Sequence, residues 1–209
     1  MAYRKSKNFD SVPGFGQSEF KSLPKGGYIC RMMMAEEIQD KNGNPMLHIA
    51  WDIIEGEYKN YFMDTYNARK KANADKPNAK EVKWPFEGQK WIPILDNEDK
   101  TRESRQFKGF CTAVADSGTE IWMPNDELNL DEIKGAEVGV IYQMVEHEYN
   151  GKTYWRAEPW GFRSIEAVAT EDFYQPEDKP LPSVNGSGTG FTSVGSADSF
   201  SAAEDDIPF

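Results

Sequence analysis

The alternation of apolar and polar residues is clearest between residues 46 and 54. One face of this segment, if extended, carries only apolar side chains, those of Leu47, Ile49, Trp51 and Ile53. His48 and Asp52 fall on the opposite face. This period of two predicts a strand with one buried side, and it places Trp51 in the hydrophobic core.

Further segments bounded by turn residues are rich in β-branched and aromatic side chains, which predicts strands at 28–35, 58–66, 138–149 and 152–162. The last two flank Asn150-Gly151, a dipeptide typical of two-residue hairpin turns. The first is separated from the strand at 46–54 by a turn at 40–45.

Helical spacing is confined to the middle of the chain. Between residues 101 and 116, apolar residues recur at intervals of three and four: Phe107, Phe110, Cys111 and Val114. Gly118 follows as a plausible stop. A short helical turn is expected at 128–134, whereas residues 67–100 look irregular and basic.

The order of these elements is three strands, a helical region and a hairpin. This order favours a mainly β fold with one or two helices, arranged as a five-stranded OB-like barrel with a helix between the third and fourth strands. A β-sandwich decorated by one helix is the alternative.

Composition divides the chain into four parts. An N-terminal arm at 1–24 precedes the OB-like domain at 25–169. A linker follows at 170–203, and the chain ends in an acidic tip at 204–209. Residues 183–201 are mostly Gly, Ser, Thr and Val, a composition that buries too little apolar surface to offset ordering entropy, so we expect a flexible linker.

The net charge of −11 is unevenly distributed. Residues 59–108 carry twelve bases and eight acids, or +4, whereas residues 109–170 carry four bases and eleven acids, or −7. Because phosphate binding depends on local patches, the acidic total does not exclude a nucleic-acid partner.

The cysteines and the N-terminus indicate a cytoplasmic protein. Cys30 and Cys111 lie in apolar stretches without metal-ligand spacing, which favours two buried thiols over a disulfide. A zinc site is not expected. The first nine residues do not have the pattern of a signal peptide, and no apolar run reaches the roughly 18 residues of a membrane helix.

Aromatic residues stand beside basic ones in three places, around 58–62, 69–91 and 149–160. Single-stranded DNA is bound by such combinations, because lysine and arginine side chains contact the phosphates and aromatic rings stack on unpaired nucleobases. Any single ring is equally suited to the core, but polar neighbours favour the surface for Tyr61, Trp84, Trp91 and Trp155. The candidate DNA-binding residues are Arg31, Lys59, Tyr61, Arg69, Lys70, Lys71, Lys83, Trp84, Lys90, Trp91, Tyr149, Tyr154, Trp155 and Arg156.

The tip has the chemistry of a partner-binding peptide. Three acids precede Ile207, Pro208 and Phe209. A basic-rimmed pocket could take the Phe209 ring while the acids steer the encounter. The candidate partner-binding residues are Asp205, Asp206, Ile207, Pro208 and Phe209. A tail that only solvates is the alternative.

This tip, after its Gly/Ser linker, is similar to the tail of bacterial single-stranded DNA-binding proteins, which docks on replication, recombination and repair enzymes. The body resembles phage-encoded OB-fold proteins that function in recombination and replication. That second resemblance rests on four short stretches: Leu-Pro-Lys-Gly-Gly-Tyr at 23–28, Ala-Glu-Glu at 35–37, Lys-Asn-Gly-Asn-Pro-Met at 41–46 and Glu-Gly-Glu-Tyr at 55–58.

The sequence thus predicts a protein that binds single-stranded DNA without sequence specificity, recruits partner enzymes through its tip and needs no cofactor. Two rivals belong to other classes. A metal-dependent nuclease could use carboxylates from Asp40, Asp52, Glu55 and Asp64. An adaptor would bind no DNA and only present the tail. No Walker loop or nucleophile elbow supports catalysis, so we do not expect an enzyme.

Overall fold

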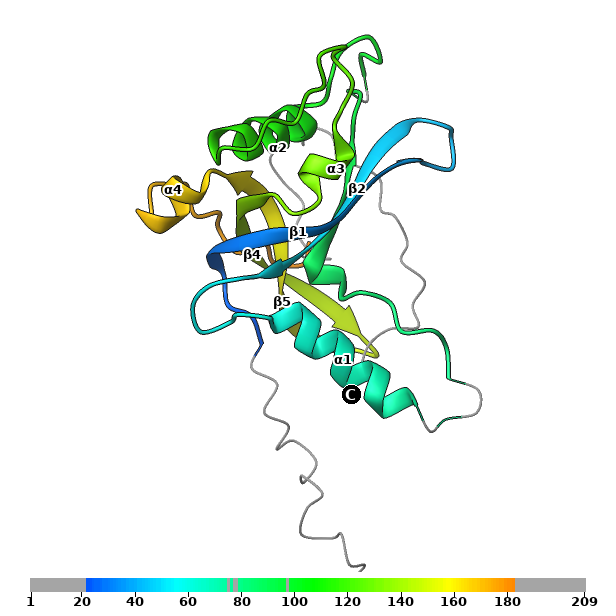
Figure 1. Cartoon of the computed structure of the whole chain (residues 1–209). Helices are drawn as coiled ribbons and strands as arrows, with labels where there is room; N and C mark the ends of the chain where they lie inside the picture. The colour runs from blue at the N-terminus through cyan, green and yellow to red at the C-terminus, as the bar shows by residue number, and fades with distance from the viewer. Residues whose placement is uncertain (1–21, 75, 77–78, 97, 183–209) are drawn as a thin grey trace, which may run out of the picture.

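The computed structural model describes residues 22–74, 76, 79–96 and 98–182 (Figure 1). Its framework is one antiparallel sheet with the strand order β3-β2-β1-β4-β5. The strands are β1 (Gly26–Gln39), β2 (Pro45–Ile53), β3 (Gln89–Pro93), β4 (Glu137–Tyr149) and β5 (Lys152–Arg163). The helices are α1 (Tyr61–Asn73), the 3-10 turn η2 (Phe86–Gly88), α2 (Arg105–Asp116), α3 (Leu130–Ile133) and α4 (Ile165–Ala169).

This arrangement confirms the expected mainly β fold with five strands, although the described residues form four α-helices rather than one or two. The helix α2 follows β3 and precedes β4, as expected for a five-stranded OB-like barrel. The sheet is open, since β3 and β5 are its two edges and do not pair. The described residues form a single sheet, so the sandwich alternative is wrong.

The core lies inside the curved sheet and under α2. The apolar face predicted for β2 is fully buried, and Trp51 packs edge-on against Phe162 of β5 at 5.7 Å between ring centroids. From α2, Phe107 and Phe110 complete this cluster. Both cysteines are buried free thiols, as predicted.

The third predicted strand is wrong, because residues 61–73 form helix α1. Asn60 takes a left-handed conformation with φ of 63° and makes no side-chain cap. The cap comes instead from Asp52 of β2, whose buried carboxylate accepts hydrogen bonds from the backbone N–H of Phe62 and Met63 at 3.0 and 3.3 Å. The aromatic run that resembled a strand therefore forms a helix held by a tertiary contact.

The real third strand lies inside the segment predicted to be irregular. Only five residues form β3, and they pair with β2 from Met46↔Pro93 to Ala50↔Gln89. Pro93 is tolerated at the end of this edge strand, because no strand on the open side needs its N–H.

The later elements agree with the sequence. Ser104 caps α2 by accepting from the N–H of Phe107, and α3 is the predicted short turn. Asn150 and Gly151 join β4 to β5 with positive φ values of 51° and 73°.

The packed part of the chain extends beyond the boundary predicted at 169. Lys179 exchanges backbone hydrogen bonds with β4, accepting from Glu146 at 2.9 Å and donating to Met144 at 2.8 Å. Asp178 pairs with Lys25, and Leu23 of the predicted arm is buried in the core. Residues 170–182 therefore belong to the domain, whereas the rest of the predicted linker and the tip lie outside the described residues.

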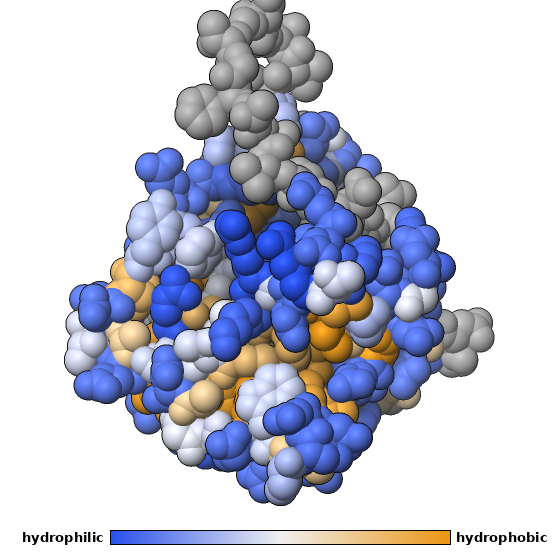
Figure 2. Space-filling model, turned by 90° about the horizontal axis from the view of Figure 1, so that it is seen from above, coloured by the Kyte–Doolittle hydropathy of each residue, from blue (hydrophilic) through white to orange (hydrophobic). Residues whose placement is uncertain are grey.

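Hydrophilic side chains cover most of the face seen in Figure 2, and apolar residues reach the surface between them. Among the described helices, none is long and apolar enough to cross a membrane.

Candidate nucleic-acid interface

The predicted basic residues gather around α1. Lys70 and Lys71 lie in the last turn of the helix, with Arg69 beside them, while Lys59 precedes the helix and Lys83 follows it. In the described part of the chain, no carboxylate lies within ion-pair distance of these five side chains. Their positive charge is therefore available to a ligand.

A row of ring and guanidinium contacts begins on the outer face of β2 and β3. The rings of His48 and Trp91 stack at 4.5 Å with 7° between their planes. Phe86 of η2 lies 6.2 Å from Trp91, and the Arg156 guanidinium lies 4.9 Å from the centre of the Phe86 ring. These contacts join strands that are distant in sequence.

The row continues onto the β4-β5 hairpin. Arg156 donates to Glu158 at 2.6 Å, and the same carboxylate oxygen lies 2.9 Å from Nε2 of His147. His147 stacks on Tyr154 at 5.6 Å. We call the six residues that carry the contacts the ring strip: His48, Phe86, Trp91, His147, Tyr154 and Arg156.

The ring strip also approaches the basic end of α1. The ammonium of Lys70 lies 5.8 Å from the centre of the Tyr66 ring, which lies 5.6 Å from Trp84. Trp84 comes just two residues before Phe86 in η2. The structure therefore brings cations for phosphates and rings for nucleobases to adjoining positions.

Two predicted stacking rings are held below the surface. Trp84 is half-buried, packs on the core and donates from its indole N–H to the carbonyl of Gly88 at 3.0 Å. Tyr61 also packs on the core, and burial raises the pKa of its hydroxyl. Their polar sequence neighbours gave no sign of this burial, which arises from the packing of α1 and η2.

Two further predicted residues, Tyr149 and Trp155, lie on the β4-β5 hairpin, whereas Arg31 does not. Trp155 is 44% exposed and points away from its neighbour Tyr154, as alternation along β5 requires. Tyr149 lies at the hairpin end of β4. Arg31 instead pairs with Glu137 on the β1-β4 side of the sheet, where the described residues give it no contact with the ring strip.

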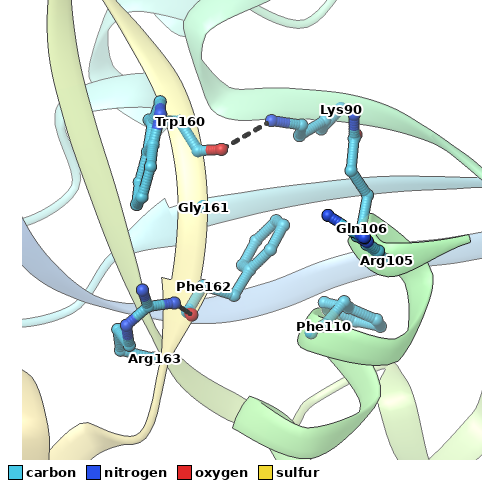
Figure 3. Close-up of a pocket in the computed structure, with 9 residues that line it drawn as sticks. Lys90, Arg105, Gln106, Phe110, Trp160, Gly161, Phe162 and Arg163 are labelled. Atoms are coloured by element: carbon cyan, nitrogen blue, oxygen red, sulfur yellow. Dashed lines mark hydrogen bonds between the residues drawn. The ribbon is translucent and has the colours of Figure 1, made fainter. Parts of the chain in front are cut away.

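The side chain of Lys90, a predicted DNA-binding residue, does not lie on the outer face of the sheet with the ring strip. Its backbone pairs with Ile49, so its side chain enters the inner face and crosses the gap between β3 and β5. The ammonium donates to the carbonyl of Pro159 at 2.8 Å. It also donates to the carbonyl of Trp160 at 3.2 Å (Figure 3). Burial lowers the pKa of Lys90 to about 8, against the opposing effect of Glu158.

Sequence reasoning missed His48, Phe86 and His147 as members of the ring strip. The alternation of β2 placed His48 opposite the core, which was a usable signal. Phe86 and His147 had none, because only the folded sheet brings η2 and the hairpin beside Trp91.

Two of the carboxylates considered for a nuclease, Asp40 and Asp52, have structural roles. Asp40 accepts hydrogen bonds from the side-chain amide of Asn44 and from the backbone N–H groups of Asn44 and Asn42. The Asn44 side-chain bond is the largest cause that lowers the pKa of the Asp40 carboxyl, and the backbone bonds act in the same direction. Asp52 caps α1. Among the described residues, no group of three or more His, Cys, Asp or Glu side chains could hold a metal ion.

Residues 7–88 match a family model described as a protein of unknown function (DUF669). The described part of this match covers β1, β2, α1 and η2, and so includes His48, Phe86 and the basic end of α1. No curated protein matches the chain.

Proposed function

We propose that this protein binds single-stranded DNA without sequence specificity, in DNA replication or recombination, and recruits partner enzymes through its acidic tip. The observation that carries the proposal is the ring strip beside the unpaired cations of α1. The resemblance to phage single-stranded DNA-binding proteins supports the same function.

The arrangement supports separate roles for the rings, which stack on nucleobases, and for the cations, which attract phosphates. Every nucleobase has a π face, so an exposed ring such as Phe86 stacks on bases without reading sequence. Lys70, Lys71 and Lys83 supply the charge that attracts the phosphates. A duplex hides its base faces and fits this surface poorly.

Binding to poly-dT should therefore quench tryptophan fluorescence and weaken steeply with salt. Counterion release predicts a log-log slope of about −0.7 per phosphate contacted. A duplex of equal length serves as the control and should bind much more weakly. A salt-independent affinity, or equal affinity for the duplex, would contradict the proposal.

The tip should act separately from the DNA-binding surface. Deleting 205–209, which lie outside the described residues, should abolish capture of replication and recombination enzymes, because a single aromatic anchor such as Phe209 dominates small interfaces. Affinity for poly-dT should stay the same or rise, since a tethered acidic peptide competes with phosphate. A pull-down from host lysate measures the loss.

The matched control deletes 185–189, five polar or glycine residues of the predicted linker. This variant should capture the same enzymes as the full chain. Equal recovery by the chain without 205–209 would show that the tip is only a solvated end.

A further inference from the structure

A cleft of about 140 Å³ lies where the open edges of the sheet approach each other (Figure 3). Its walls come from β3, β5 and the first turns of α2. Lys90 crosses the seam between these two edge strands here. We call this cleft the seam pocket.

Three cations surround the seam pocket: Lys90, Arg105 and Arg163. Arg163 donates to the adjacent carbonyl of Phe162 at 2.7 Å, and Lys90 donates to carbonyls of β5. Within the described residues, no carboxylate forms an ion pair with any of the three. By contrast, Arg31, Arg102 and Arg156 each have acidic partners.

Aromatic rings form the rest of the seam pocket. Phe110 and Phe162 meet edge to face at 5.0 Å and form its buried floor. Trp160 stands on the opposite flank, 39% exposed, with the Arg163 guanidinium 5.8 Å from its ring centre. Figure 3 shows the Trp160 ring and the Arg163 side chain on the same side of the cleft. An exposed ring beside a guanidinium suits a ligand that is both aromatic and anionic.

We propose that the seam pocket binds the terminal phosphate monoester of a nucleotide unit, with the attached base against Trp160. This inference rests on the proposed function, which supplies the nucleic acid. A monoester carries about 1.5 to 2 negative charges at neutral pH, whereas a diester within a strand carries one, so a site with three cations favours the monoester. The cleft holds one such group between β5 and α2.

Two features strengthen the positive field in the seam pocket. Arg105 and Gln106 form the first turn of the twelve-residue helix α2, where backbone N–H groups carry partial positive charge. The Lys90 ammonium adds its charge from the β3 side, although burial lowers its pKa to about 8.

The test compares thymidine 5′-monophosphate with thymidine, and a 5′-phosphorylated dT oligomer with its unphosphorylated form, by calorimetry on the full chain. The phosphate should strengthen binding about tenfold, the effect of one charge-assisted hydrogen bond. Arg105→Gln and Arg163→Gln should each reduce this advantage to about twofold or less. Lys108→Gln, which removes an exposed charge from the same helix outside the pocket, should retain it.

The mononucleotide and oligomer titrations distinguish a strand end from a free nucleotide as the source of the phosphate. They also distinguish failure of the seam pocket inference from failure of the proposed function. A gain for the oligomer assigns the site to a strand end, while a gain for the mononucleotide alone assigns it to a free nucleotide. If the unphosphorylated oligomer binds but phosphorylation adds nothing in either arm, the seam pocket inference is wrong and the proposed function stands. If no oligomer binds while the mononucleotide does, the proposed function fails and the pocket remains.

Discussion

The Trp51→Ala variant is expected to lose about 3–5 kcal/mol of folding free energy, the cost of emptying a large core site. Trp51 is fully buried, and its indole N–H donates to the Tyr142 hydroxyl at 2.9 Å. That hydroxyl donates in turn to the carbonyl of Glu87 at 2.8 Å. The substitution therefore opens a cavity and removes the donor that Tyr142 accepts from. Urea unfolding followed by far-UV circular dichroism measures the loss.

Trp155→Ala is the matched control, because it removes the same side chain from an exposed position. Its effect on unfolding should stay below about 1 kcal/mol. Trp51→Phe separates the two contributions, since it keeps most of the apolar volume and loses only the N–H. If Trp155→Ala proved as destabilising as Trp51→Ala, the packing of the sheet described above would be incorrect.

The Phe86→Ala/Trp91→Ala variant should bind poly-dT far more weakly than the unchanged protein. Each ring that stacks on a base contributes about 1–3 kcal/mol, or about five- to 150-fold in affinity. The two rings are in contact, so their effects need not add. Fluorescence anisotropy with a labelled dT oligomer at fixed salt gives the affinities.

Trp122→Ala provides the control for this variant. Trp122 is 43% exposed, but it packs on Phe107 of α2 and takes no part in the contacts of the ring strip. Its loss should leave affinity within about twofold, which corresponds to less than 1 kcal/mol. A separate Lys70→Gln/Lys71→Gln variant should make the affinity for poly-dT fall less steeply as the salt concentration rises. Equal affinities of the Phe86→Ala/Trp91→Ala and Trp122→Ala variants for the dT oligomer would exclude the ring strip as the binding surface.

Asp52 illustrates why one element could not be predicted. Its place on the polar face of β2 followed from alternation, which by itself gives no sign of burial. The structure buries it as the cap of α1, and desolvation raises the pKa of its carboxyl despite three backbone N–H donors. Helix and cap are separated by eight residues or more, so no local pattern connects them.

The candidate site divides in the same way. The basic run at the end of α1 and the aromatic hairpin were visible as residue types. Their meeting at Phe86 was not, and neither was the inward turn of Lys90. Local composition indicates which side chains could contact nucleic acid, but the pairing of β2 with β3 decides which of them share a face.

By itself, the sequence determined the features that depend on short-range chemistry. The strict alternation of β2 identified a buried face with Trp51 on it, Asn150-Gly151 identified the hairpin, and the spacing of Phe107 and Phe110 identified α2. Only the tertiary structure decided α1, β3, the ring strip and the seam pocket. Each of these depends on contacts between residues far apart in the chain, whose energies outweigh weak local preferences once the sheet has formed.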